Sequence, residues 1–318
     1  MRVAIIGGTG HIGSFLTPKL VDAGHSVVCV SRGLKEPYRR HAAWQIIDWI
    51  EIDRTTQEDE GRFGESIARL DAEVVIDLTC YRLESAKQLV EGLRGRVQHL
   101  LHCGTIWVHG PSVEIPTVES EPRKPFGDYG KRKAAIEEYL LHESGRSGLP
   151  VTILHPGHLV GPGWVPINPA GNFNPEVFSM LLQGREVKLP NLGMETLHHV
   201  HADDVAQGFI RAMERRAQGL GESFHIVSSA ALTLRGYAER VAGWSGCSAK
   251  LQFLSWEDWR QRVTEKDATV TRDHIEHSSN CSIVKASTLL GYEPRYTSLE
   301  AIHESVDWLI EQGIVSAK

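Results

Sequence analysis

A tyrosine and a lysine lie four residues apart in the stretch GDYGKRK, at Tyr129 and Lys133. Positions i and i+4 share one face of an α-helix, so the phenol hydroxyl and the ammonium could converge on one ligand. A nearby ammonium favours the phenolate and lowers the tyrosine pKa from its ordinary value of about 10. The pair could then serve as a general acid/base. Alone the spacing is weak, because it arises by chance in about one of four chains of such composition.

A glycine-rich segment near the N-terminus offers a second kind of chemistry. The apolar run VAII (3–6) leads directly into GGTGHIG (7–13), which satisfies both Gly-x-Gly-x-x-Gly and Gly-x-x-Gly-x-x-Gly. Such glycines permit a tight turn and a close backbone approach to a pyrophosphate at the positive end of the next helix. The segment predicts dinucleotide binding, with a glycine turn that holds no ligand as the alternative. The expected contacts are Gly7, Gly8, Thr9, Gly10, His11, Ile12 and Gly13.

The end of the second apolar run, VVCVSRG (27–33), indicates which dinucleotide binds. NAD-binding units usually place an acidic residue there to accept from both ribose hydroxyls, whereas this chain has Ser31 and Arg32. A hydroxyl donor and a planar guanidinium suit the oxygens of a 2′-phosphate. We therefore expect NADP, with NAD as second choice and a merely solvated Arg32 as the alternative explanation. Asp53, after the third apolar run, should lie nearer the adenine.

Short apolar runs alternate with helix-length segments in the first half of the chain. The runs are VAII (3–6), SVVCV (26–30), IEI (50–52), EVVIDL (73–78), VQHLLHC (97–103) and PVTILH (150–155). Continuous apolar strands that are each followed by a helix indicate a parallel sheet covered on both faces. We predict an α/β fold: a Rossmann-type, doubly wound parallel sheet at residues 1–157 and a smaller, interleaved substrate-binding lobe at residues 158–318. About residues 197–215 should pack back on the first domain.

The predicted helices place the tyrosine–lysine pair. One helix is expected from Tyr129 to about Ser144, ended by Gly145. The following stretch GHLVGPGWVPINPAGNFNP (157–175) is rich in glycine, proline and asparagine, and is expected to line a pocket. Further helices are predicted near residues 176–183, 202–215, 254–263 and 298–312.

Several motifs together resemble the extended, NAD-dependent epimerase/dehydratase branch of the short-chain dehydrogenase/reductase family. HCGTIWVHG (102–110) is similar to the family's fifth-strand segment, with Thr105 at the position of the catalytic Ser or Thr, and Tyr129 and Lys133 match its Tyr-x-x-x-Lys. The other matching segments are HPGHLVGPG (155–163), LHHVHADDVA (197–206) and LLGYEPRYTSLEAI (289–302). The resemblance covers nearly the whole chain, and the order and spacing of its motifs are specific.

This likeness implies an NAD(P)-dependent oxidoreductase or epimerase that transfers hydride at a carbinol or carbonyl carbon of a small polar, possibly sugar-derived substrate. Tyr129 would be the acid/base, Lys133 its electrostatic partner and ribose clamp, and Thr105 the hydrogen-bonding partner of the substrate oxygen. Additional cofactor contacts are expected at Arg54, Leu78, Thr79, Pro156 and His158, and substrate contacts at Cys80, Trp107, Trp164, Asn168, Asn172 and His199.

Departures from the family pattern limit the choice of substrate and reaction. Nucleotide-sugar members commonly have a phosphate-binding arginine where this chain has Leu197, and an arginine or tyrosine and an asparagine where it has His155 and His158. A UDP-sugar is therefore in doubt. Dehydratases usually add an acid pair after the Ser/Thr, whereas Ile106 and Trp107 follow here, so dehydration is the least supported reaction.

Composition favours a cytoplasmic protein with a small-molecule substrate. The net charge of -6 offers no basic surface for nucleic acid, the five cysteines are scattered, and no apolar run is long enough for a membrane span. No metal site is expected, since strand alternation sets His198 opposite His199 and His201. A homodimer through about 83–93 and 129–144 is possible by family likeness. Two alternatives remain open: a regulatory protein that binds NADP without catalysis, and an RNA-binding relative of the kind known from plastids.

Overall fold

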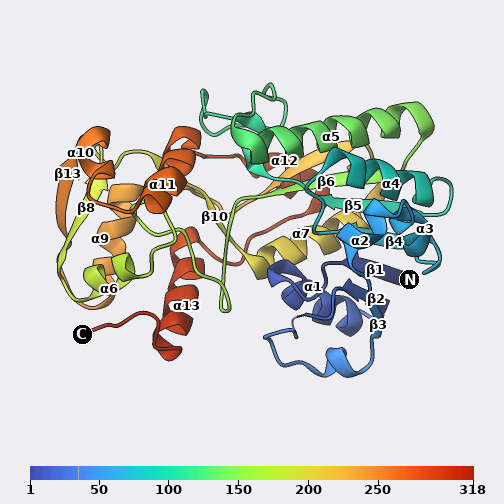
Figure 1. The fold of residues 1–318 in the computed structure, drawn as a ribbon, viewed down its shortest axis with the longest axis horizontal. Helices are drawn as coiled ribbons and strands as arrows, with labels where there is room; N and C mark the ends of the chain where they lie inside the picture. Colours follow the sequence, from blue (N-terminus) through green and yellow to red (C-terminus); the bar gives the residue numbers. More distant parts are fainter. Residues whose placement is uncertain (35) are drawn as a thin grey trace.

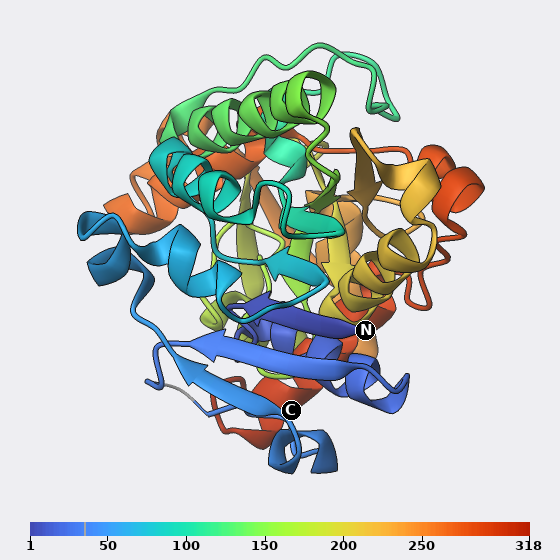
Figure 2. The same cartoon turned by 90° about the vertical axis from the view of Figure 1, so that its right-hand side faces the viewer.

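A seven-stranded parallel sheet forms the centre of the first lobe in the computed structural model, which describes residues 1–34 and 36–318. The strand order is β11-β6-β5-β4-β1-β2-β3, and every neighbouring pair is parallel. Figures 1 and 2 show these strands from two directions. Their bounds are β1 (Arg2–Ile6), β2 (Ser26–Ser31), β3 (Asp48–Glu51), β4 (Val74–Asp77), β5 (His99–Cys103), β6 (Val151–Pro156) and β11 (Glu222–Ile226).

Helices cover both faces of this sheet because successive strand residues point to opposite faces and both sets are apolar. Val3 and Ile5 of β1 pack with one set of helices, whereas Ala4 and Ile6 pack with the other. The first face carries α1 (His11–Asp22), α7 (Ala202–Glu214) and α12 (Val284–Leu290). The second carries α3 (Phe63–Ala68), α4 (Leu83–Leu93) and α5 (Gly127–Ser147). Among the described residues, no helix is both long and apolar enough to cross a membrane.

The second lobe consists of short two-stranded sheets and the helices packed around them (Figure 1). Phe178, Tyr237 and Trp259 are fully buried in its core. Its strand pairs are β7 (His158–Val160) with β10 (His199–His201), β8 (Glu186–Pro190) with β13 (Lys250–Leu254), and β9 (Thr196–Leu197) with β12 (Leu232–Thr233). Its helices are α6 (Glu176–Leu182), α9 (Leu234–Trp244), α10 (Trp256–Arg260), α11 (Glu265–His277) and α13 (Ser298–Glu311). The short elements elsewhere are η1 (Ala42–Gln45), α2 (Arg54–Asp59), η2 (Ile106–His109) and α8 (Arg216–Gly219).

The predicted fold class is confirmed, and the differences have local causes. Helix α5 continues past Gly145 to Ser147, because Gly148 at φ 70° supplies the left-handed C-cap that ends it. The helix predicted over 254–263 spans only Trp256–Arg260, after the Ser255 N-cap. The strand β11, which comes from the second half of the chain, was not predicted as part of the main sheet. It pairs with β6 and forms one edge of that sheet.

Candidate active site

The glycine loop between β1 and α1 is built so that only glycine fits. Gly7 adopts φ 87°, and a Cβ atom at Gly13 would lie 2.3 Å from the carbonyl oxygen of Gly8. A Cβ at Gly8 would lie 2.6 Å from the sulfur of Cys29. The loop therefore stays close to the sheet and leaves the N-terminus of α1, capped by Gly10 without a side-chain hydrogen bond, open to an anion. This arrangement fits a pyrophosphate.

A cleft of about 440 Å³ runs from this loop along the ends of β1, β2 and β4. Gly7, Thr9, Gly10, Ser31, Arg32, Arg54 and Thr79 contribute to its wall. The Ser31 hydroxyl accepts a hydrogen bond of 3.3 Å from the backbone of Gly33, so its own proton remains available to a ligand. The Arg54 guanidinium is already paired with two carboxylates of the protein, Asp77 at 2.8 Å and Glu58 at 2.5 Å.

Two predicted cofactor residues have structural roles that the sequence does not show. Asp53 caps α2 by accepting from the backbone of Thr56 at 2.9 Å, and this bond lowers the pKa of its carboxyl. The ring of His11 points toward the second lobe, where its Nε2 lies 3.1 Å from the carbonyl oxygen of Val160. It also stacks on Trp164 at 5.0 Å between ring centroids. His11 therefore joins the glycine loop to the second lobe.

The three predicted catalytic residues line one pocket of about 270 Å³. Thr105 follows β5 and caps η2, where its hydroxyl accepts from the backbone of Trp107 at 3.3 Å. Tyr129 lies in the first turn of α5, and Lys133 lies one turn further along the same helix. The segment after β5 and the start of α5 thus bring these three side chains together, as the helical spacing and the strand order predict.

The ammonium of Lys133 is held by the protein itself. Its Nζ donates to the carbonyl oxygens of Cys80 at 2.8 Å and Cys103 at 2.7 Å, and the residue is only 2% exposed. The ring centroid of Tyr81 lies 4.9 Å from Nζ, on its remaining side. Burial lowers the pKa of this ammonium.

In the ligand-free protein, the pKa of Tyr129 is set by burial. Burial of the hydroxyl in the pocket raises its pKa above the ordinary value, although 42% of the whole residue is exposed at the pocket mouth. Thr105 lowers this pKa only in part. The lowering expected from Lys133 together with an oxidised nicotinamide ring concerns the cofactor-bound protein; in the ligand-free protein the Lys133 ammonium faces the two carbonyls. Tyr129 is therefore a protonated phenol at neutral pH, ready to act as an acid.

The remaining pocket wall is aromatic and neutral. Trp107 stacks on His277 with ring centroids 4.0 Å apart and contacts His274 at 5.0 Å. Burial lowers the pKa of His274 to about 4 and that of His158 well below its ordinary value. Both imidazoles are therefore uncharged at neutral pH.

The predicted contacts separate into two groups. Ile12, Leu78, Trp107, Pro156, His158 and Trp164 all line the pocket. Cys80 lies buried behind the wall, and burial raises the pKa of its thiol to about 12. Asn168 and Asn172 hydrogen-bond to each other at 2.7 Å within their own loop. The His199 ring faces the carbonyl of Ile167 at 3.3 Å.

Several wall residues were not named from the sequence, and the larger side chains among them are Tyr81, Ile167, Phe173 and His274. Tyr81 borders both the pocket and the glycine-loop cleft. His274 comes from α11, whose histidines suggested no contact with a strand-end motif so far away in the chain. Leu197, at the expected arginine position, is fully buried in the core of the second lobe.

Comparison with known proteins places the chain in a family. Residues 3–226 match the NAD dependent epimerase/dehydratase family, and the chain belongs to it. A UDP-glucose 4-epimerase of Mycolicibacterium smegmatis is 26% identical over 330 residues, which cover 97% of this chain and 98% of that protein. Chloroplast stem-loop binding protein of 41 kDa b from Arabidopsis thaliana is 24% identical, over 96% of this chain and 78% of that protein.

The solved structures agree on the fold. UDP-glucose 4-epimerase of Thermotoga maritima, crystallised with UDP-glucose, superposes with a TM-score of 0.75 at 22% identity, covering 98% of this chain and 99% of that one. The predicted family, the Rossmann fold and the assignment to a family of NAD-dependent enzymes are therefore confirmed.

Proposed function

We propose that the protein catalyses reversible hydride transfer between NADP(H) and a carbinol or carbonyl carbon of a small, uncharged polar substrate. One observation carries this proposal: Thr105, Tyr129 and Lys133 share a pocket that meets the glycine-loop cleft at Tyr81. A hydride carrier in the cleft and an acid in the pocket would then reach the same carbon and oxygen.

Each of the three residues has a distinct task. Tyr129, as a protonated phenol, gives its proton to the substrate oxygen during reduction and takes it back during oxidation. The Thr105 hydroxyl donates a hydrogen bond to the same oxygen. Two protons of the Lys133 ammonium stay on the carbonyls of Cys80 and Cys103, and the third turns to a ribose hydroxyl when the Tyr81 ring moves aside. The nicotinamide, when bound, supplies or accepts the hydride.

The pocket chemistry favours an uncharged substrate. Lys133 is the one cationic side chain among the described residues of its wall, and its ammonium is engaged by the backbone. With His158 and His274 neutral and Leu197 in the core, the wall offers little to balance a diphosphate. A sugar-derived or aromatic alcohol, aldehyde or ketone suits the tryptophan-lined surface. The nucleotide-sugar substrates named for relatives are the competing choice.

Substitution of Tyr129 by phenylalanine tests the mechanism. The ring packs edge-on against Trp107 at 5.9 Å, and this contact survives in Tyr129→Phe. Cofactor affinity and thermal stability should stay near wild type, whereas the rate should fall on the order of 10²–10⁴, the usual contribution of a positioned acid. Tyr139→Phe, on the outer part of the same helix, is the matched control. Undiminished turnover in Tyr129→Phe removes this residue from the mechanism. Cofactor binding without turnover on a panel of carbonyl compounds identifies a regulatory protein instead.

RNA binding is a second candidate because one relative is named a stem-loop binding protein. The chain's net charge of -6 opposes it, since phosphate contacts supply most non-specific affinity. A gel-shift titration with a stem-loop RNA should show no complex at physiological salt. A complex whose affinity falls steeply with salt, and which the inactive Tyr129→Phe variant also forms, establishes the RNA-binding function.

A further inference from the structure

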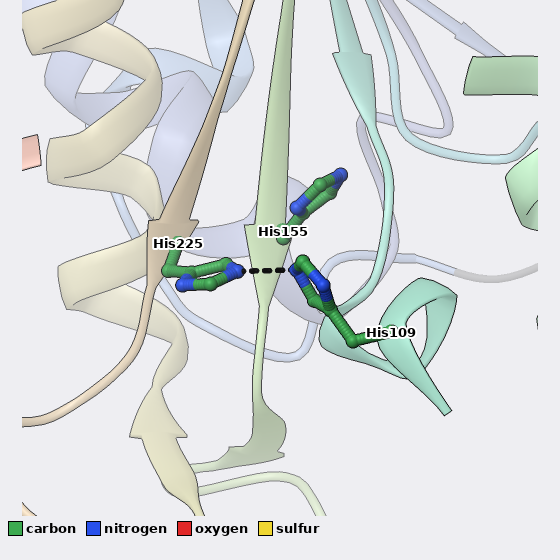
Figure 3. A group of neighbouring side chains, drawn as sticks. All are labelled: His109, His155 and His225. Atoms are coloured by element: carbon green, nitrogen blue, oxygen red, sulfur yellow. Dashed lines mark hydrogen bonds between the residues drawn. The ribbon is translucent and has the colours of Figure 1, made fainter. Parts of the chain in front are cut away.

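Three buried histidines lie close together outside the catalytic pocket (Figure 3). His109 ends η2, His155 lies in β6, and His225 lies in β11 at the sheet edge. One ring nitrogen from each lies within 4.8 Å of the other two. These residues, here called the histidine cluster, are 6%, 0% and 0% exposed.

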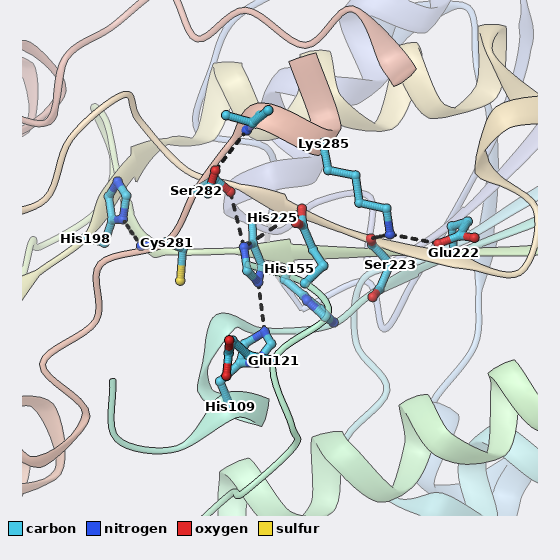
Figure 4. A network of polar contacts seen from close by, with 12 residues as sticks. His109, Glu121, His155, His198, Glu222, Ser223, His225, Cys281, Ser282 and Lys285 are labelled. Carbon is cyan, nitrogen blue, oxygen red and sulfur yellow. Dashed lines mark hydrogen bonds and ion pairs between the residues drawn. The ribbon is translucent and has the colours of Figure 1, made fainter. Parts of the chain in front are cut away.

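Hydrogen bonds fix the orientation of two of the rings. His225 Nδ1 lies 3.2 Å from the carbonyl oxygen of Ser282, and His155 Nε2 lies 2.6 Å from the carboxylate of Glu137. Both partners accept only, so these two nitrogens carry protons and the opposite nitrogens present lone pairs. His155 Nδ1 has no hydrogen-bond partner among the described residues, although it is fully buried. Figure 4 shows the His225 ring between Ser282 on one side and His109 on the other.

The third ring completes a set of ligands. His109 Nε2 lies 2.8 Å from His225 Nε2, so in the free protein a proton on one nitrogen bridges the pair. An ion bound by imidazoles at about 2.0–2.1 Å in tetrahedral geometry needs ligand nitrogens about 3.3 Å apart. This nitrogen–nitrogen distance is longer than the 2.8 Å between His109 and His225, and shorter than the 4.8 Å within which all three ligand nitrogens lie.

The surrounding charge favours a cation. Glu119 and Glu137 are buried carboxylates beside the cluster, and Glu119 accepts from the backbone N–H of His225 at 2.9 Å. The Arg123 guanidinium pairs with Glu137 at 2.7 Å, and its Nη1 lies 3.5 Å from Nδ1 of His109, the nitrogen opposite the one that faces His225. Two carboxylates and one guanidinium leave one negative charge next to three imidazoles. A carboxylate that orients a histidine is also the common support of histidine-bound metals.

We propose that the histidine cluster binds a divalent transition-metal ion of the zinc class. Three neutral imidazoles without thiolate suit Zn²⁺, which accepts tetrahedral nitrogen ligands and leaves a fourth position for water. This assignment differs from the sequence-based expectation of no metal and is independent of the proposed reaction. The other compact group, Asp77, Cys80 and His102, is unsuitable because the Arg54 guanidinium already occupies the Asp77 carboxylate.

The ion would have a structural task near the active site. It would join η2, which follows β5, to β6 and to the edge strand β11. Gly104 packs against the His155 ring so closely that a Cβ there would lie 2.5 Å from Cδ2. Thr105 is the next residue, so the ion fixes the segment that carries this predicted catalytic hydroxyl.

Metal analysis of protein purified without a histidine tag tests the proposal. After treatment with a chelator, addition of Zn²⁺ and desalting, the wild type should retain about one ion per chain, and Zn²⁺ at about 100 times its dissociation constant should raise Tm by about 5 °C. His155→Gln and His225→Gln should lose both responses. His99→Gln, a buried strand histidine bonded to Thr152, is the matched control and should keep them.

Two results overturn the proposal: a wild type that retains no ion and shows no Tm shift, or an ion that persists in the His155→Gln/His225→Gln double variant. X-ray absorption of the zinc-loaded wild type gives a readout that does not depend on whether the variants fold. Three imidazole nitrogens in the first coordination sphere support the cluster, and a sphere of oxygen or sulfur ligands contradicts it.

Discussion

Replacement of Arg32 by alanine should abolish a preference for NADPH over NADH. In the structure Ser31 and Arg32 both line the glycine-loop cleft at the end of β2, and the Ser31 proton is free to donate. A hydrogen bond to a charged group contributes about 1.5–3 kcal/mol, which corresponds to a preference of about 10- to 100-fold. Two acids reduce this value: Arg32 acts on Asp53, whose pKa it helps to lower, and the Glu51 carboxylate lies beside Gly33. We therefore expect the wild-type preference near tenfold.

Titration of both reduced cofactors, followed by fluorescence at two salt concentrations, measures this preference. Arg32→Ala should weaken NADPH binding about tenfold and leave NADH unchanged, because the ribose hydroxyls do not need the guanidinium. Glu51→Gln is the informative control, since removal of the nearby negative charge should strengthen NADPH binding. Equal affinities in the wild type would show that the reasoning from Arg32 is wrong. Tighter NADH binding that Glu51→Gln weakens would show in addition that Glu51 holds the ribose.

Two further predictions concern stability and assembly. Burial alone would raise the pKa of Asp77, but Arg54 lowers it below its ordinary value, so this carboxylate stabilises the fold above pH about 4 and loses that effect as the pH falls. Asp77→Asn should therefore lower the free energy of unfolding by about 3 kcal/mol at pH 7 and by less at pH 3, measured by denaturant titration; an equal loss at both pH values contradicts this. A homodimer through α4 and α5 should give a sedimentation mass of two chains at micromolar concentration, and a mass of one chain at every concentration refutes it.

The parallel sheet could be predicted because most of its strands, such as β1 and β4, are continuous apolar runs that are each followed by a helix. The exception is β11, whose sequence ESFHI is short and whose partner β6 lies far away in the chain. Nothing local distinguishes such a strand from one of the small sheets in the second lobe. The helical spacing likewise predicted that Tyr129 and Lys133 would share a pocket.

Features that depend on contacts between distant segments could not be predicted. The pKa of Tyr129 follows from burial, and the direction of the Lys133 ammonium follows from two backbone carbonyls that no side-chain pattern encodes. The asparagines of the loop after β7 were expected to bind substrate, but their amides stabilise the loop itself, as asparagine commonly does in turns. Each member of the histidine cluster is a single buried histidine in its own segment, and only the fold brings them together.

Two parts of the first lobe, β11 and α12, come late in the sequence, and this position affects when the lobe can fold during synthesis. Residues 222–226 complete the sheet beside β6, and Ala286 and Leu290 of α12 join the core on the face of α1. During translation the ribosome has therefore to extend the chain past residue 290 before the nucleotide-binding lobe can close. Until residues 222–226 have been made, β6 is an exposed edge strand, a surface that is prone to aggregation in partly folded chains. The lobe whose glycine loop is synthesised first therefore depends, for its complete sheet and core, on segments that are synthesised near the end of the chain.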